Sequence, residues 1–212
     1  MSTNHLSQPF TLPCGVTIPN RIAKSALSEG IADAAGNPSE KLFNLYKRWG
    51  EGGAGILFSG NTMVDKRHLT NADIMIAEKE NPFIEDYKKL AEVAQAHGSH
   101  LWMQVSHPGR QAPIYLDKAP VSASDVGMPS KMYVQPRPLP EEEILDLIER
   151  FGDAALIAKE SGMKGAQIHG AHGYLVSQFL SPLTNKREDQ WGGSLENRAR
   201  FVLEIYRNMR KK

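Results

Sequence analysis

The stretch Gly165-Ala166-Gln167-Ile168-His169-Gly170-Ala171-His172-Gly173-Tyr174 joins a short apolar run to a cluster of two imidazoles and a phenol. The run Gly165–Ile168 predicts a buried strand. Imidazole N–H groups can donate to an anionic oxygen, and a tyrosine hydroxyl with an ordinary pKa near ~10 keeps its proton at neutral pH. The stretch therefore predicts a site at a strand end that holds a polarised oxygen and delivers a proton. The alternative is that these side chains only satisfy loop backbone groups.

The same alternation of an apolar run and a helical pattern occurs four times along the chain. Apolar or β-branched runs at residues 21–27, 55–64, 100–105 and 165–168 predict strands. Each run is later followed by apolar residues at helical spacing, which predicts a buried stripe on a helix. The four stripes consist of Leu42, Leu45, Tyr46 and Trp49; Phe83, Tyr87, Leu90 and Ala94; Ile144, Leu147, Ile148, Phe151 and Ala155; and Val202, Ile205, Tyr206 and Met209.

Start and stop signals bound these helices, and a hairpin precedes them. The first turns are marked by Asn37-Pro38-Ser39, Asn81-Pro82, Pro140 and Ser194, and glycines at 50, 52, 98 and 162 end the first three helices. Before the first strand, Phe10-Thr11-Leu12 and Val16-Thr17-Ile18 flank Pro13-Cys14-Gly15, which predicts a β-hairpin.

Loop lengths place the expected site at the carboxyl ends of the strands, and a missing glycine motif favours a barrel over an open sheet. Connections from a helix to the next strand are short, whereas residues 106–139 and 170–193 follow strand ends and are long. In (β/α)8 barrels, the loops at the carboxyl ends of the strands form the active site. A Rossmann sheet is disfavoured because no G-x-G-x-x-G follows a strand; Gly50, Gly52, Gly53 and Gly55 precede one. Segment 106–139 contains six prolines, which predicts an irregular excursion over the active face.

Composition favours a globular protein that acts on a small molecule. The 212 residues carry a net charge of +1 with 41% hydrophobic and 23% charged residues, so we expect neither a nucleic-acid partner nor an anionic membrane surface. Cys14 is the single cysteine, which excludes a disulfide framework and a cysteine-rich metal site. Residues 1–8 lack the pattern of a signal peptide, and no apolar run approaches the ~18 residues of a membrane span. The expected location is the cytoplasm.

Several motifs, taken in order, resemble one known family. These are Asn20-Arg21-Ile22-Ala23-Lys24-Ser25-Ala26-Leu27-Ser28, then Met103-Gln104-Val105-Ser106-His107-Pro108-Gly109-Arg110, then the 169–174 cluster, followed by Asp189-Gln190-Trp191-Gly192-Gly193-Ser194-Leu195-Glu196-Asn197-Arg198. Together they resemble the old yellow enzyme family. That family comprises FMN-dependent NAD(P)H:flavin oxidoreductases, many of them ene-reductases, on a (β/α)8 barrel.

The resemblance implies a role for each matching residue. Flavin-lining positions would be Ser25, Ala26, Leu27, Ser28, Asn61 and Gln104, with His169 also close to the flavin. Gln104 suits the pyrimidine edge because an amide both donates and accepts. His169 and His172 would bind the carbonyl oxygen of an α,β-unsaturated substrate, and Tyr174 would protonate its α-carbon while hydride reaches the β-carbon. Many relatives have Cys or Thr at Ser28, Pro or Ala at Ala26, and some have Asn at His172.

The count of four units implies half of a barrel. We expect an α/β fold of the (β/α)8 TIM-barrel type with only the first four βα units, residues 1–20 forming the hairpin and lead-in and residues 21–212 the units. The phosphate-binding loops of the seventh and eighth units and the basic side chain of the fifth strand, which the resemblance implies, do not occur in this sequence. We therefore expect weak FMN binding, and unpaired strand edges through which copies could form a homo-oligomer.

Two other functions and several blander interpretations stay open at this stage. A barrel hydrolase could use His169 and His172 as metal ligands, although a carboxylate at close spacing is lacking. A half-barrel without catalytic activity could serve only in binding or assembly. Outside the cluster, we expect His5, His68, His97 and His100 at the surface or in loops. Lys24 and Arg110 could belong to the barrel, a loop or the site, and Glu29 and Asp65 could act as acids or helix caps. We expect Asn197 and Arg198 to hold the loop that precedes the last helix.

Overall fold

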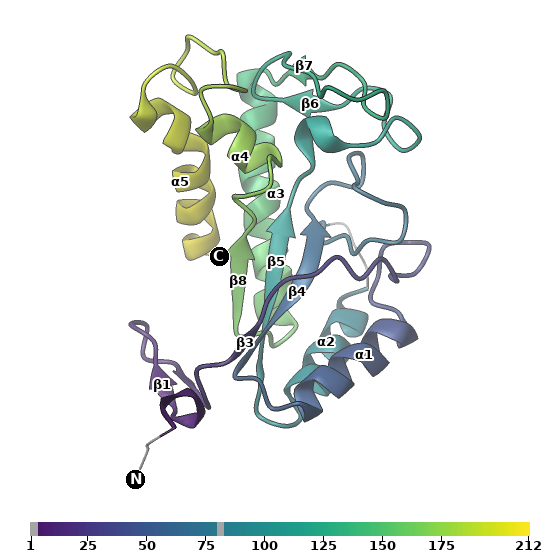
Figure 1. The fold of residues 1–212 in the computed structure, drawn as a ribbon, viewed down its shortest axis with the longest axis vertical. Helices are drawn as coiled ribbons and strands as arrows, with labels where there is room; N and C mark the ends of the chain where they lie inside the picture. The colour runs from purple at the N-terminus through teal and green to yellow at the C-terminus, as the bar shows by residue number, and fades with distance from the viewer. Residues whose placement is uncertain (1–3, 80–82) are drawn as a thin grey trace.

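A parallel four-stranded sheet organises the chain in the computed structural model, which describes residues 4–79 and 83–212. Its strands are β3 (Ala23–Lys24), β4 (Ile56–Met63), β5 (His100–Ser106) and β8 (Gly165–Ile168), in the order β3-β4-β5-β8. All three pairings are parallel. The predicted parallel α/β architecture is therefore confirmed, and the carboxyl ends of the strands point to one end of the molecule (Figure 1).

Helices cover one face of this sheet and leave the other open. Along β5, Leu101, Met103 and Val105 are fully buried in the core with residues from the helices, whereas Trp102 and Gln104 are only half-buried. Because successive side chains of a strand point to opposite faces, this alternation identifies a helix-covered face and an uncovered one. The uncovered face carries Gln104, one of the residues predicted for the site.

The predicted helices form with small shifts of their ends. They are α1 (Glu40–Glu51), α2 (Ile84–Gln95), α3 (Glu141–Glu160) and α5 (Leu195–Lys211). Ser194 caps α5 as predicted, and Ser39, from the predicted start at 37–39, caps α1; each side chain accepts from the backbone N–H three residues later. Pro140 precedes α3, and three glutamates lie in the first turn, at the positive end of its dipole. The start predicted at Asn81-Pro82 lies outside the described residues.

Two predicted stripe residues are wrong: Phe83 lies before the first turn of α2, and the buried face of α5 is rotated relative to the expected one. Phe83 is 44% exposed and Tyr206 is 56% exposed. On α5 the buried residues are Phe201 and Ile205; the Phe201 ring lies 4.3 Å from that of Phe179. Tyr206 instead borders a hollow along β8. Elsewhere the core uses neighbours of the expected residues: Phe43 and Ala154 are buried, whereas Leu45, Trp49, Ala155, Val202 and Met209 are half-buried.

Two strand predictions also need correction. The first strand spans only Ala23–Lys24 instead of 21–27, and residues 25–28 follow it outside the sheet. All four residues of β8 are half-buried, not buried, because β8 is an edge strand of the described sheet. The predicted hairpin is confirmed by the antiparallel pair β1 (Phe10–Thr11) and β2 (Thr17–Ile18), which follows the short helix η1 (His5–Ser7).

The long segments after β5 and β8 are more regular than expected. Segment 106–139 contains the 3-10 helix η2 (Gly109–Gln111) and a parallel pair, β6 (Val121–Ser122) and β7 (Arg137–Pro138). After β8 comes a helix that the sequence analysis missed, α4 (Leu175–Leu180). In Figure 1 these elements gather at the carboxyl ends of β4, β5 and β8, and β1 lies at the opposite end. The long connections therefore lie at the carboxyl ends of the strands, as the loop lengths predicted.

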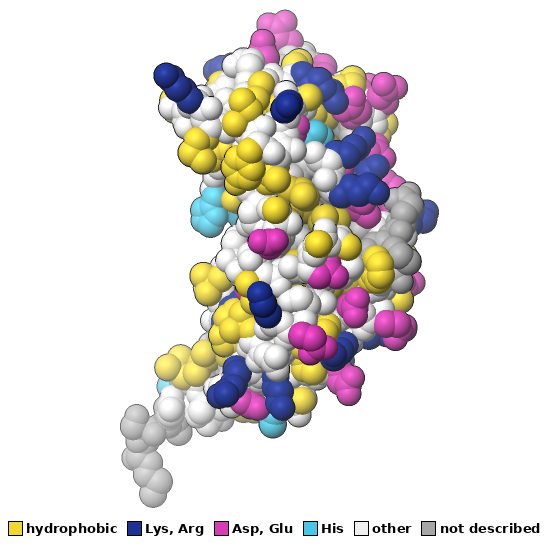
Figure 2. Space-filling model, turned by 90° about the vertical axis from the view of Figure 1, so that its right-hand side faces the viewer, with side chains coloured by type: hydrophobic (Ala, Val, Ile, Leu, Met, Phe, Trp, Pro, Cys, Tyr) yellow, Lys and Arg dark blue, Asp and Glu magenta, His cyan; other side chains and the backbone are white. Residues whose placement is uncertain are grey.

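The surface shows mixed charge. In the view of Figure 2, Lys and Arg side chains are interspersed with Asp and Glu, in keeping with a net charge of +1. Among residues 4–79 and 83–212, no helix has both the length and the hydropathy that crossing a membrane requires.

Candidate active site

His169 lies immediately after β8, and its backbone N–H continues the sheet by donating to the carbonyl of Val105 at 2.9 Å. Its ring is held by the amide of Ala171, which donates to Nδ1 at 3.3 Å. A neutral ring with Nδ1 as acceptor carries its proton on Nε2. Burial, and then the neighbouring His172, lower the pKa of His169, which keeps the ring neutral. His169 can therefore donate one hydrogen bond from Nε2.

His172 is placed by an unusual turn. Its φ of 58° is the single positive value for a non-glycine residue in the described chain, and Gly173 follows with 74°. The left-handed region is costly for a residue with a Cβ, so surrounding contacts must hold it. One is the side-chain amide of Gln111, which donates to the carbonyl of His172 at 2.8 Å. The turn brings the His172 ring edge-on to His169, with 5.1 Å between centroids.

Tyr174, the residue directly before α4, completes the cluster. Its ring centroid is 4.9 Å from that of His169, at an interplanar angle of 89°. Burial, and then the nearby Tyr133, raise the pKa of Tyr174, so its hydroxyl keeps the proton at neutral pH. The structure thus brings together all three residues of the predicted catalytic cluster at one strand end.

Gln178 supports this loop from beneath, and the sequence analysis missed it. It is fully buried, and its amide nitrogen donates to the carbonyls of Gly173 at 2.7 Å and Pro108 at 3.1 Å. Its amide oxygen accepts from the Arg110 backbone N–H at 3.2 Å and from Ser122 Oγ at 2.9 Å. Gln178 therefore joins α4, η2 and β6 behind the His172–Tyr174 turn.

A row of amides crosses the sheet next to the cluster. Asn61, Gln104 and Gln167 lie at one level of β4, β5 and β8 in the strand register. Gln104 Nε2 donates to Gln167 Oε1 at 2.8 Å. The pair still offers an acceptor, Gln104 Oε1, and a donor, Gln167 Nε2. Gln167 was not predicted, although it stands two residues before His169, and the period of two along a strand puts both side chains on one face.

The segment 25–28 approaches the same row from β3. Ser28 Oγ donates to Asn61 Oδ1 at 2.6 Å, and Asn61 is 5% exposed. Leu27 is 57% exposed. The residues Ser25, Ala26, Leu27 and Ser28 thus lie beyond the end of β3 rather than within a strand, which corrects the strand prediction.

Glu29 anchors this segment, serving neither as a free acid nor as a helix cap. Its Oε1 accepts from Tyr46 Oη at 2.6 Å and from the Gly60 backbone N–H at 3.1 Å. Lys24 Nζ lies 3.7 Å from the same oxygen and 3.9 Å from the centroid of the Trp49 ring. Lys24 therefore belongs to the interface between the sheet and α1 and not to the site.

The remaining polar residues have structural contacts. Arg198 pins the loop before α5 as predicted, since its Nε donates to the carbonyl of Leu180 at 2.9 Å. Arg110 holds segment 106–139 by donating to the carbonyls of Val126 and Gly127, each at 3.0 Å. His68 was expected at the surface or in a loop; it lies in a loop after β4 but not at the surface, since it is 9% exposed and its Nδ1 lies 2.6 Å from Asp117 Oδ2.

A fold of parallel βα units, with its candidate site at the carboxyl ends of the strands, defines an α/β protein, the class that includes TIM barrels. The chain belongs to the NADH:flavin oxidoreductase / NADH oxidase family, whose model matches residues 5–212. It is 39% identical to the NADH-dependent flavin oxidoreductase iliE of Hypocrea jecorina, over 97% of this chain and 56% of that protein. It is 36% identical to the probable NADH-dependent flavin oxidoreductase YqiG of Bacillus subtilis, over 97% and 55%. The chain thus spans about half the length of these relatives.

Solved structures agree with this assignment. Morphinone reductase in complex with tetrahydroNAD superposes with a TM-score of 0.91 at 25% identity, over 99% of this chain and 61% of that one. The old yellow enzyme homologue from Zymomonas mobilis gives 0.89 at 27%, over 96% and 59%. The resemblance to the old yellow enzyme family is confirmed, and the four-stranded sheet corresponds to part of such a barrel.

The cofactor of this family is FMN, with NAD(P)H as reductant. The amide row fits such a group: Gln104 and Gln167 present an acceptor and a donor side by side on the open face of the sheet, as a flavin pyrimidine edge requires. Gln104, Gln167 and Asn61 are the described residues that would hold it.

Proposed function

We propose that this chain carries the substrate-binding and proton-donating part of an FMN-dependent NAD(P)H oxidoreductase that reduces activated alkenes. Residues 1–20 would form the lead-in and residues 21–212 four βα units of a single FMN-binding barrel domain. The observation that carries the proposal is the contact of His169 with both His172 and Tyr174 at the end of β8, one strand from Gln104. FMN, when bound, supplies the hydride.

The histidines would bind the carbonyl oxygen of an α,β-unsaturated substrate. His169 offers its Nε2 proton because the amide of Ala171 occupies Nδ1. His172 lies beside it, on the exposed turn. Two donors fixed before the reaction stabilise the negative charge that develops on that oxygen, by about 3 kcal/mol for a well-placed donor.

Tyr174 would give the proton to the α-carbon. Its raised pKa keeps the hydroxyl protonated, and its ring is fixed edge-on to His169 at the start of α4. The phenol takes part only in the step in which the alkene is protonated, so its role is separable from reduction of the cofactor.

The test uses Tyr174→Phe in a protein of the full length of its relatives. Enone reduction should slow by about 10²–10⁴-fold while flavin reduction by NADH stays nearly unchanged. Tyr206→Phe, on the exposed face of α5, is the matched control and should change neither rate. Slowed flavin reduction by NADH, together with a normal rate of enone reduction by flavin that is already reduced, would refute the role of Tyr174.

The histidines are tested by phenolic ligands, which resemble the enolate oxygen. His169→Ala or His172→Ala should each weaken phenol binding by about tenfold or more, the value of a charge-assisted hydrogen bond. Unchanged phenol affinity in both variants would remove the histidines from oxygen binding.

The hydrolase alternative receives no support. The described residues that could together hold a metal ion are Asp65, His68 and His107, and this group includes neither His169 nor His172.

A further inference from the structure

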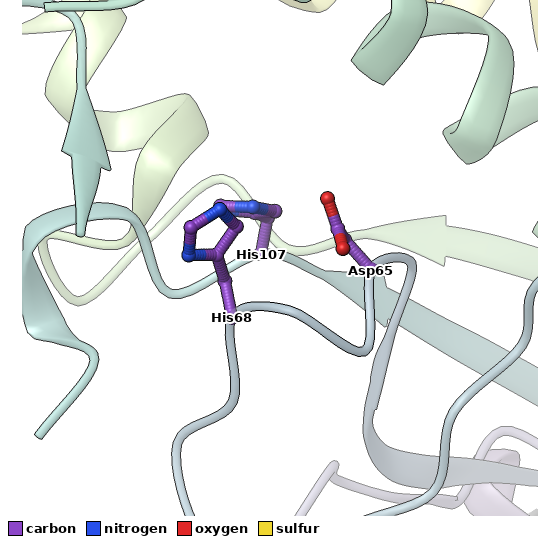
Figure 3. A group of neighbouring side chains, drawn as sticks. All are labelled: Asp65, His68 and His107. Atoms are coloured by element: carbon purple, nitrogen blue, oxygen red, sulfur yellow. The ribbon is translucent and has the colours of Figure 1, made fainter. Parts of the chain in front are cut away.

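A second cluster of polar side chains lies at the carboxyl ends of β4 and β5, outside the site described above. Asp65 and His68 follow β4 and His107 follows β5, and Figure 3 shows His107 between the other two. One potential ligand atom of each lies within 4.8 Å of the others. The three residues are 0%, 9% and 1% exposed, in that order. Buried groups of this kind need partners.

The ring of His107 is incompletely satisfied. Its Nδ1 accepts from the Gly109 backbone N–H at 3.0 Å. Its Nε2 is buried and has no hydrogen-bond partner among the described residues. An unpaired buried polar atom costs about 1–3 kcal/mol, so the cluster offers a place for one more atom.

His68 is oriented by a carboxylate behind it. Asp117 Oδ2 lies 2.6 Å from His68 Nδ1, and the other oxygen of Asp117 accepts from the Ala119 backbone N–H at 2.8 Å. An ionised carboxylate at Nδ1 places the ring proton there, which leaves Nε2 with a lone pair. This carboxylate–histidine pair is the usual arrangement behind metal-bound histidines.

We propose that Asp65, His68 and His107 form a binding site for a divalent transition-metal ion, with Zn²⁺ the best match to two imidazoles and a carboxylate. His68 and His107 would ligate through Nε2 and Asp65 through one carboxylate oxygen, with solvent completing the shell. Ligand atoms of tetrahedral zinc are roughly 3.4 Å apart, so the cluster has to contract by about an ångström.

Two existing contacts oppose the ion. Arg67 pairs with Asp65 through Nε, 2.9 Å from Oδ1, and through a terminal nitrogen, 2.6 Å from Oδ2. Ligation through Nε2 of His107 also moves its proton to Nδ1, which ends the hydrogen bond from Gly109. The Arg67 side chain is 57% exposed and can turn into solvent without leaving a buried charge. Arg67 therefore competes with the metal ion for the carboxylate of Asp65, and this competition can be measured as a change in metal affinity.

The ion would brace the rim that carries the active site. It would connect the loop after β4 to the end of β5, and the carbonyl of His107 accepts from the backbone N–H of Leu175 at 3.0 Å, directly after Tyr174. The role is structural, and no ligand of the ion belongs to the His169 cluster.

The experiment titrates the 212-residue chain with zinc by calorimetry, in a non-thiol reductant because Cys14 is exposed, and measures retained zinc by mass spectrometry. We expect one ion per chain and a raised melting temperature. His68→Gln and His107→Gln should abolish binding, and Asp117→Asn should weaken it by about 10–100-fold. His97→Gln, at an exposed histidine, is the matched control and should bind normally.

Arg67→Gln gives a test that misfolding cannot imitate. Freeing Asp65 from the guanidinium should tighten zinc binding by about tenfold. Zinc that survives His68→Gln, zinc that is lost with His172→Gln, or an affinity that Arg67→Gln leaves unchanged or lowers would overturn the proposal. Absence of stoichiometric zinc in the unsubstituted chain would overturn it as well.

Discussion

Replacing Glu29 with alanine should destabilise the chain by about 3 kcal/mol, because this carboxylate joins segment 25–28 to β4 and α1. Its side chain is 6% exposed, and its Oε1 accepts from Tyr46 Oη at 2.6 Å. Burial and the carboxylate raise the pKa of Tyr46 well above its ordinary value, so the phenol stays a donor. Gly60 N–H has a second acceptor in Tyr46 Oη at 3.1 Å, so the amide keeps a partner after the substitution.

The magnitude follows from the groups that lose a partner. The phenol hydrogen bond to an ionised acceptor contributes about 2 kcal/mol. Lys24 keeps the carbonyl of Phe58 at 2.8 Å but loses its counter-ion at 3.7 Å, which adds about 1 kcal/mol after allowance for solvent screening. Tyr46→Phe removes the same hydrogen bond, so the double variant should be less destabilised than the sum of the single variants by about 1–2 kcal/mol.

Urea unfolding followed by tryptophan fluorescence measures this loss, and Trp49, next to Lys24, is a local reporter. The matched control is Glu40→Ala on the surface of α1. Its side chain is 74% exposed and pairs with Lys89, so the loss should be about 0.2–1 kcal/mol. If Glu29→Ala costs no more than Glu40→Ala, or if the Glu29 and Tyr46 substitutions are additive, the anchoring role is wrong.

Three further predictions concern the active-site loop. Gln178→Leu should lower the free energy of unfolding by about 3–4 kcal/mol in urea melts, because four hydrogen bonds end on its amide, two of them buried and two partly buried. His172→Val should cost about 1–2 kcal/mol more than His172→Asn in the same assay, since asparagine tolerates a φ of 58° and a β-branched residue does not. Burial and His172 lower the pKa of His169 in the folded chain, so the unfolded chain takes up a proton first as the pH falls below about 6.5. The free energy of unfolding should then drop by at most about 1.4 kcal/mol per pH unit until the folded ring is also protonated. His169→Asn should flatten this pH dependence.

Local signals account for the parts of the fold that were predicted correctly. The caps Ser39 and Ser194 bind backbone N–H groups three residues ahead, so they can be read from the sequence alone. The β8 bounds and the hairpin turn at Gly15 also rest on neighbours in the chain. The local stretch 169–174 indicated His169, His172 and Tyr174, and the family motifs added the flavin-lining positions, such as Asn61 and Gln104.

Long-range contacts explain what was missed. In the sequence, nothing distinguishes Gln178 from other polar residues. Its role depends on Pro108 and Ser122, which the fold brings into hydrogen-bonding distance. His68 lies 49 positions from Asp117, and no spacing rule joins them. On α5, the choice of Phe201 over Tyr206 depends on the ring of Phe179 in α4, a helix too short for its periodicity to be recognised.

Two different constraints fix the two halves of the candidate site. Gln104, Gln167 and His169 are set by strand register, which several backbone hydrogen bonds determine together, so a substitution at one of them leaves the others in place. His172 and Tyr174 depend instead on the left-handed turn at 172–173, which Gln111 and Gln178 hold from outside. Substitutions in these two supporting glutamines should therefore displace Tyr174 while the amide row stays in place.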